Sequence, residues 1–143
     1  DRSMTTPAAP RQPRSGCPIS IALELLGDAW SLLIVRDLMF KGRRTYNDFL
    51  AGGEGIASNV LASRLRKLEG ANIIEKRSDP RDARRYIYRL SPKGIDLAPV
   101  LVDLVIWSAR HVQTDAPPAV VRSMREDRER FLADVRRRWR TSA

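Results

Sequence analysis

Apolar residues recur every three or four positions along most of the chain, a spacing that predicts amphipathic helices. Helices are expected at 18–26, 29–41, 45–50, 58–69, 92–111 and beyond Pro117. Apolar and polar residues alternate at 73–78 and at 84–90, which predicts a β-hairpin with a turn at 79–83. The order of these elements predicts a mainly α fold with a small β-hairpin (α+β), a winged helix-turn-helix.

Residues that favour helix starts precede several of these segments. Asp28, Thr45 and Ser58 carry side chains that accept hydrogen bonds from the free N–H groups of a first helical turn, so each is expected at an N-cap. Ser91 is expected to cap the long helix in the same way. Pro99 falls inside that helix and is expected to bend it slightly, because proline lacks the N–H that continues the helical hydrogen bonds.

The segment 58–69 has an apolar stripe and a polar, cationic face. Leu61, Leu65 and Leu68 lie on one side of the predicted helix. Such a helix can pack on a small core and present its other side to a major groove, where arginine pairs with guanine and asparagine with adenine. The alternative interpretation is the solvated face of an ordinary helix. The residues predicted to contact bases or phosphates here are Ser58, Asn59, Ser63, Arg64, Arg66 and Lys67.

The tip of the predicted hairpin carries three arginines. Arg81, Arg84 and Arg85 lie at or beside the turn, where a guanidinium can enter a minor groove or bind phosphate. Asp79 and Asp82 are expected to shape the turn. A hairpin of this kind after a helix-turn-helix is a wing, and the alternative is a basic loop that contacts nothing.

The net charge of +9 at pH 7 is concentrated in two segments. Residues 58–90 hold nine Lys or Arg and four Asp or Glu, which gives +5, and residues 120–140 hold eight and four, which gives +4. A polyanionic partner is therefore expected, most simply double-stranded DNA, with an acidic membrane surface as the competing interpretation. The sequence has no window of about 18 apolar residues, so no transmembrane helix is expected.

Three parts are expected along the chain. Residues 1–16 are a proline-rich flexible arm, and residues 17–112 are a winged helix-turn-helix that binds DNA and dimerises. Residues 117–140 form an accessory amphipathic, basic helix, which is too short to hold a core alone. A homodimer built from the first helix and the long helix is predicted, because the long helix carries more apolar surface than one small domain can cover. The apolar residues behind this prediction are Leu97, Val100, Leu101, Leu104, Val105 and Trp107.

Little in the sequence indicates catalysis. The chain has one His and one Cys, no phosphate-binding glycine loop and no metal-spaced cluster, so no enzyme, catalytic residue, cofactor or metal site is expected. The single cysteine favours a reducing, cytoplasmic location. Cys17 is the candidate redox sensor, since thiols at helix N-termini are commonly reactive, and the alternative is a small buried hydrophobe. Trp30 and Trp107 are interpreted as core residues rather than ligand contacts, and His111 as a cap or interface residue.

Ordered motifs resemble the HxlR-type regulators. They lie at 17–19, 25–34, 44–49, 56–61, 64–69 and 88–94. The resemblance implies a dimeric, DNA-binding transcription regulator of bacterial type, and some members of that family sense electrophiles or oxidants through a cysteine at the start of the first helix. A symmetric dimer would read a pseudo-palindromic operator, and a small-molecule effector is a further candidate partner.

Two features depart from this family. Asn72 stands where the family usually has glycine, although asparagine tolerates the left-handed conformation that a helix end needs. The wing tip 79–82 is more similar to the MarR family. A MarR-like repressor that responds to a small ligand, and a winged helix that binds protein instead of DNA, are therefore the alternatives.

Overall fold

The computed structural model describes residues 12–142 of the chain. It confirms the predicted winged helix-turn-helix, mainly α with a small β-hairpin. The predicted arm 1–16 lies mostly outside the described residues, and residues 12–16 belong to no helix or strand. In chain order the elements are α1 (Pro18–Leu26), α2 (Ser31–Phe40), α3 (Tyr46–Leu50), α4 (Ser58–Gly70), β1 (Ile74–Asp79), β2 (Asp82–Leu90), α5 (Pro92–Ile95), α6 (Ala98–His111), α7 (Pro118–Glu126) and α8 (Arg128–Thr141).

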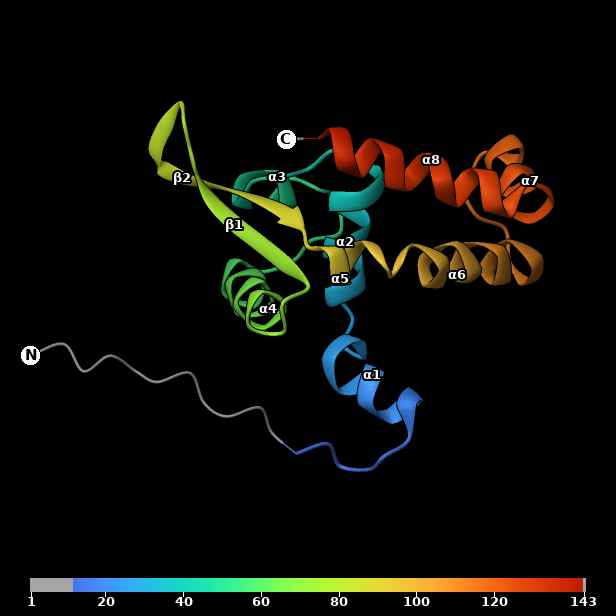
Figure 1. Ribbon diagram of the computed structural model, residues 1–143, viewed down its shortest axis with the longest axis horizontal. Coiled ribbons are helices and arrows are strands. Elements are labelled where there is room, and N and C mark those ends of the chain that lie inside the picture. Colours follow the sequence, from blue (N-terminus) through green and yellow to red (C-terminus); the bar gives the residue numbers. More distant parts are fainter. Residues whose placement is uncertain (1–11, 143) are drawn as a thin grey trace, which may run out of the picture.

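Helix α2 lies at the centre, with α3, α4 and the hairpin on one side and α6, α7 and α8 on the other (Figure 1). Ile34 and Val35 of α2 are buried, as its nearly continuous apolar sequence predicts. Helix α1 lies apart from this body, and none of its residues is buried. The buried core cluster consists of Ile34, Val35, Phe49, Leu61, Leu65, Leu68, Ile73, Ile74, Tyr88, Leu90, Ile95, Ala98, Leu101 and Val135.

The two strands pair antiparallel, with Ile74 opposite Leu90 at the base of the wing. The strands run closer to the tip than predicted, so residues 80–81 alone join them instead of the expected turn 79–83. Ile74, Tyr88 and Leu90 are buried at the base. The base of the hairpin is therefore anchored in the core, while its tip projects away from the body (Figure 1).

Two predicted caps are confirmed. The Thr45 hydroxyl accepts a hydrogen bond from the backbone N–H of Asp48, and the Asp48 carboxylate accepts one from the N–H of Thr45, which is a capping box at the start of α3. The Ser91 hydroxyl accepts from the N–H of Gly94 at the start of α5. Both helices are too short to persist without such end contacts.

The predicted cap at Ser58 is wrong. Helix α4 begins at Ser58 itself, and Ala57 occupies the N-cap position with extended backbone angles. A side chain that is already inside the first turn cannot reach the N–H groups that an N-cap residue reaches. The first turn of α4 has no side-chain cap among the described residues.

Asn72 has a φ of 59°, which confirms that asparagine takes the left-handed conformation here. Its backbone N–H donates to the carbonyl of Glu69, and the N–H of Ile73 donates to that of Leu68. These bonds satisfy carbonyls at the end of α4 and turn the chain into β1.

The predicted long helix 92–111 is wrong in one respect, because it is two helices. α5 ends at Ile95 and α6 begins at Ala98. Pro99 is the second residue of α6 and has no N–H to donate to the carbonyl of Ile95, so a single continuous helix would lose that bond. The proline therefore separates the two helices instead of bending one.

The predicted single C-terminal helix is also two helices. They are separated at Asp127, whose φ of −133° and ψ of 47° are not helical. The break lets each helix lay its own apolar side on the body: Val121 and Met124 of α7 and Val135 of α8 are buried. Figure 1 shows α8 running back alongside α6 toward the hairpin. The segment is thus packed on the winged helix and is not a separate unit.

No single helix among the described residues is long and apolar enough to cross a membrane. Helices α1 and α2 reach that length and composition only as a pair, bent by 80° at the break between them.

Candidate nucleic-acid interface

Helix α4 has the two faces that its sequence predicts. Leu61, Leu65 and Leu68 are buried, with exposed fractions of 3% or less. Asn59 and Arg66 are exposed on the other side. Ser63 lies between them at helical spacing and is half-buried, and its hydroxyl accepts a hydrogen bond from Arg64. The buried leucines fix the rotation of α4, so its polar face points away from the core.

The start of α4 is held by the helix before it. The Tyr46 hydroxyl of α3 donates to the carbonyl of Ser58 at 3.1 Å. Because no described side chain caps this end, the first N–H groups of α4 are available to an anion such as a phosphate.

Arg64 and Lys67 lie on the flank of α4 and point toward the start of α2. Arg64 Nε is 3.1 Å from one carboxylate oxygen of Asp28, and Lys67 Nζ is 3.9 Å from the other. The Arg64 side chain is 29% exposed and the Lys67 side chain 37%. Arg64, predicted at the edge of the apolar stripe, is therefore placed to position α4, and Lys67 is shared between this contact and solvent.

Asp28 was predicted to cap the second helix, and it does so from outside the N-cap position. Its carboxylate accepts hydrogen bonds from the backbone N–H groups of Trp30 and Ser31 and from the Ser31 hydroxyl. Burial raises the pKa of Asp28, but the bonds from Ser31 and Trp30 and the contact with Arg64 outweigh it and lower this pKa from 3.8 to about 2.

The wing arginines are exposed to different degrees. The Arg84 side chain is 90% exposed beside Asp82, and the Arg85 side chain is 55% exposed with one nitrogen 3.2 Å from Asp79. Arg81 is exposed at the tip, and its backbone N–H donates to the Asp79 carboxylate. Asp79 and Asp82 thus shape the turn, as predicted.

A hollow of about 370 Å³ lies between the wing and the start of α3. Its lining includes Arg77, Arg81 and Arg85 from the wing, together with Arg44 before α3. The sequence analysis missed Arg77. Strand alternation carried through the pairing of Arg77 with Ile87 would have placed it on the face that Arg85 shares.

The remaining candidates lie away from this surface. Cys17 is exposed at the N-cap of α1 and is not the small buried hydrophobe of the alternative interpretation. Trp107 is 64% exposed on α6, so its interpretation as a core residue is wrong, and its ring lies 5.3 Å from that of His111. Trp30 is half-buried beside α2. The described residues contain no group of three or more His, Cys, Asp or Glu that could hold a metal ion.

A helix-turn-helix followed by an arginine-bearing wing defines the class of winged helix-turn-helix transcription regulators. Residues 25–116 match the HxlR-like helix-turn-helix family. The chain belongs to this family, which decides between the two resemblances seen in the sequence. Helices α7 and α8 lie beyond the matched residues.

Three relatives illustrate the relationship. The chain is 37% identical over 86 residues to the HTH-type transcriptional regulator sll1512 of Synechocystis sp., spanning 60% of this chain and 63% of that protein. It is 35% identical over 108 residues to Rv3095 of Mycobacterium tuberculosis, spanning 75% of this chain and 67% of that protein. The structure of the reduced form of YodB from Bacillus subtilis has a TM-score of 0.57 at 30% identity and covers 69% of this chain and 97% of its own. The protein is a transcriptional regulator with a helix-turn-helix domain.

Proposed function

We propose that this regulator binds a specific double-stranded DNA sequence as a homodimer. The observation that carries the proposal is the orientation of α4, which buries its leucine stripe and exposes Asn59 and Arg66 beside a wing of exposed arginines. Asparagine and arginine are the side chains that pair bidentately with adenine and guanine in a major groove.

The other predicted contacts divide by position. On α4, Ser58 and Ser63 lie with Asn59 and Arg66 toward the bases, while Arg64 and Lys67 position the helix against Asp28 and reach phosphate at most from its flank. On the wing, we assign the phosphate or minor-groove contacts to Arg77, Arg81, Arg84 and Arg85.

Two apolar faces support the dimer. Ile19 and Leu23 of α1 are 71% and 56% exposed. Val100, Leu104 and Trp107 of α6 recur at helical spacing and are 44–64% exposed. Large apolar side chains in contiguous exposed rows mark interfaces, and a second copy of the chain would cover both rows. Leu101, predicted in the same set, is instead buried in the core of one protomer.

A two-fold dimer would present two α4 helices to one face of DNA. Successive major grooves on one face are roughly 34–36 Å apart, so the operator should be pseudo-palindromic with half-sites one turn apart.

We also propose that Cys17 responds to oxidants or electrophiles. It is exposed at the start of α1, one of the two helices assigned to the dimer. The relative YodB has been solved in quinone-bound and diamide-treated forms. Modification of Cys17 would act on the dimer, and through it on the spacing of the two α4 helices.

The test is a DNA-binding titration. Footprinting upstream of the protein's own gene would define an operator duplex, and fluorescence anisotropy at several salt concentrations would measure its affinity. Arg66→Ala should weaken binding by about tenfold or more and relax the preference at one base position. The matched control is Arg122→Ala, which removes an exposed arginine on α7, at the end of the molecule away from α4 (Figure 1). Retention without salt dependence, or equal loss in both variants, would contradict the proposed face.

A further inference from the structure

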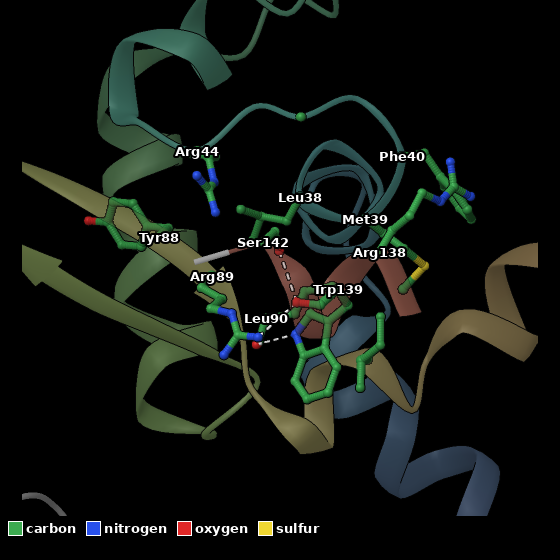
Figure 2. A pocket seen from close by; sticks show the side chains of 12 residues that line it. Leu38, Met39, Phe40, Arg44, Tyr88, Arg89, Leu90, Arg138, Trp139 and Ser142 are labelled. Carbon is green, nitrogen blue, oxygen red and sulfur yellow. Dashed lines mark hydrogen bonds between the residues drawn. The ribbon is translucent and has the colours of Figure 1, made fainter. Parts of the chain in front are cut away.

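A cavity of about 240 Å³ lies where the C-terminal helix meets the base of the wing. Figure 2 shows its walls, which come from the end of α2, from β2 and from the last turn of α8. The α8 wall lies beyond the residues that match the family, so this cavity depends on a part of the chain that the family match does not include.

The lining combines cationic and apolar groups. Arg44, Arg89 and Arg138 line the cavity, and no carboxylate is among the described residues that do so. The remaining wall is largely apolar, with Leu38 near its middle and the indole of Trp139 below (Figure 2). Ligand sites commonly pair an apolar wall with a few charged groups that fix orientation. The excess of positive charge selects an anion, and the apolar wall selects a hydrocarbon body.

Arg89 adds an independent observation. Its Nη2 donates to the Trp139 carbonyl at 2.8 Å, and its guanidinium lies 4.7 Å from the centre of the Trp139 ring. Its Nε is buried and has no hydrogen-bond partner among the described residues. A buried donor without a partner is destabilising, so an acceptor oxygen in the cavity would be bound more tightly than on an open surface.

We propose that this cavity binds a small organic carboxylate with an aromatic or short aliphatic body. The carboxylate would lie toward the arginines, and the body against Leu38 and Trp139. A volume of 240 Å³ limits the ligand to a small molecule.

An occupant would connect three elements that otherwise move independently at this point. It would contact the end of α2, the base of the wing and the end of α8 together. Its expected consequence is a change in the position of the wing, and hence in DNA affinity. Binding to the cavity does not depend on the proposed DNA-binding function, whereas this consequence does.

The experiment uses 1-naphthoate as the probe, with the full chain. Calorimetry should give a dissociation constant on the order of 0.1 mM, as expected for a ligand of this size. The neutral analogue 1-naphthalenemethanol and inorganic phosphate should each bind at least about tenfold more weakly, because each lacks one half of the chemistry. In nitrogen-15 spectra the indole N–H signal of Trp139, which donates to the Leu90 carbonyl, should shift, while those of Trp30 and Trp107 should not.

Variants locate the site. Arg138→Gln should weaken 1-naphthoate binding about five- to tenfold. Arg137→Gln removes the same charge from the next residue of α8, which does not line the cavity, and should bind as the unmodified chain does. Leu38→Phe should fill the cavity and abolish binding.

Three results would overturn the site: no binding at about 5 mM probe, binding of phosphate as tight as that of naphthoate, or equal effects of Arg138→Gln and Arg137→Gln. A shift confined to the Trp107 signal would place the probe on the exposed face of α6 instead. Specific binding that leaves operator affinity unchanged would overturn the effect on the wing. Loss of operator binding without any probe would instead contradict the proposed function alone.

Discussion

Asp28 joins two helices through one carboxylate. It accepts hydrogen bonds from Trp30 and Ser31 at the start of α2, and it lies within ion-pair distance of Arg64 and Lys67 on α4. The orientation of the proposed DNA-contacting helix therefore depends on a residue that does not face the DNA.

The lowered pKa of Asp28 makes this contact pH-dependent. The folded-state pKa of about 2 lies below the ordinary 3.8, so the charged form stabilises the fold above pH 4. That contribution is lost as the pH falls through 3.8 toward 2. A shift of this size corresponds to roughly 2 kcal/mol.

Asp28→Asn should lower the free energy of unfolding by about 1–2 kcal/mol at pH 7, because the amide keeps some of the hydrogen bonds and loses the charge. Denaturant unfolding at pH 7 and at pH 2–3 would measure the difference, which should shrink at the lower pH. Asp115→Asn, an exposed aspartate in the loop between α6 and α7, is the control and should change neither value. A loss in Asp28→Asn that stays constant with pH would mean that shape, and not charge, holds the contact.

At the scale of elements, α8 acts as a support for the wing. The Trp139 indole N–H donates to the Leu90 carbonyl at the end of β2, and the Trp139 carbonyl accepts from Arg89. Two further ion pairs, Arg128 with Asp103 and Arg136 with Asp96, hold α8 along the chain between β2 and the end of α6. The proposed DNA-contacting hairpin is thus attached to a helix outside the family match.

Trp139→Ala should lower the free energy of unfolding by about 2 kcal/mol, less than for a fully buried tryptophan, because the ring is only partly buried. Amides near the base of β2 should exchange hydrogen faster, and operator affinity should fall because the wing is held less firmly. Hydrogen exchange and anisotropy would measure the two effects. Trp139→Phe keeps most of the packing and should lie between the other two proteins. Faster exchange in α6 but not in β2 would show that α8 supports a different element.

The sequence predicted those elements that local signals determine. The stripe of Leu61, Leu65 and Leu68 predicted which side of α4 is buried, and the box of Thr45 and Asp48 predicted where α3 begins. Both signals lie within one or two turns of the chain.

What the sequence did not predict depends on contacts between distant segments. The break at Asp127 follows from α7 and α8 each packing on the body, and the turn of Arg64 toward Asp28 joins residues 36 positions apart. No local pattern reports either contact. The same holds for the cavity at the base of the wing, whose walls come from three separate parts of the chain.

At the scale of the whole molecule, the exposed apolar rows of α1 and α6 determine the assembly. Leu104→Glu places a charge in the middle of the α6 row, where it would be buried in a dimer and solvated in a monomer. Sedimentation at micromolar concentration should therefore show a dimer for the unmodified chain and a monomer for the variant, with unchanged circular dichroism. Val120→Glu changes an exposed valine of α7 in the same way and should remain dimeric. A monomeric unmodified chain would contradict the dimer.

The dimer also determines how Cys17 can act. The chain has one cysteine, so a disulfide at Cys17 must join two protomers or bind a small thiol. Diamide would accept the two electrons and two protons released when two thiols form that bond. Either product changes the surroundings of α1 and so the relative position of the two α4 helices. Both half-sites would then lose contact together.

Diamide or a quinone should therefore weaken operator binding by the unmodified protein about fivefold or more, within the usual range for coupling between two sites. Cys17→Ser should bind as tightly and should not respond. Anisotropy before and after treatment measures the affinity, and non-reducing electrophoresis or mass spectrometry identifies the product at Cys17. Restoration of binding by dithiothreitol would distinguish a disulfide from a quinone adduct, which is a carbon–sulfur bond that a thiol does not reduce. An equal response in Cys17→Ser would place the chemistry elsewhere in the protein and leave Cys17 without a sensing role.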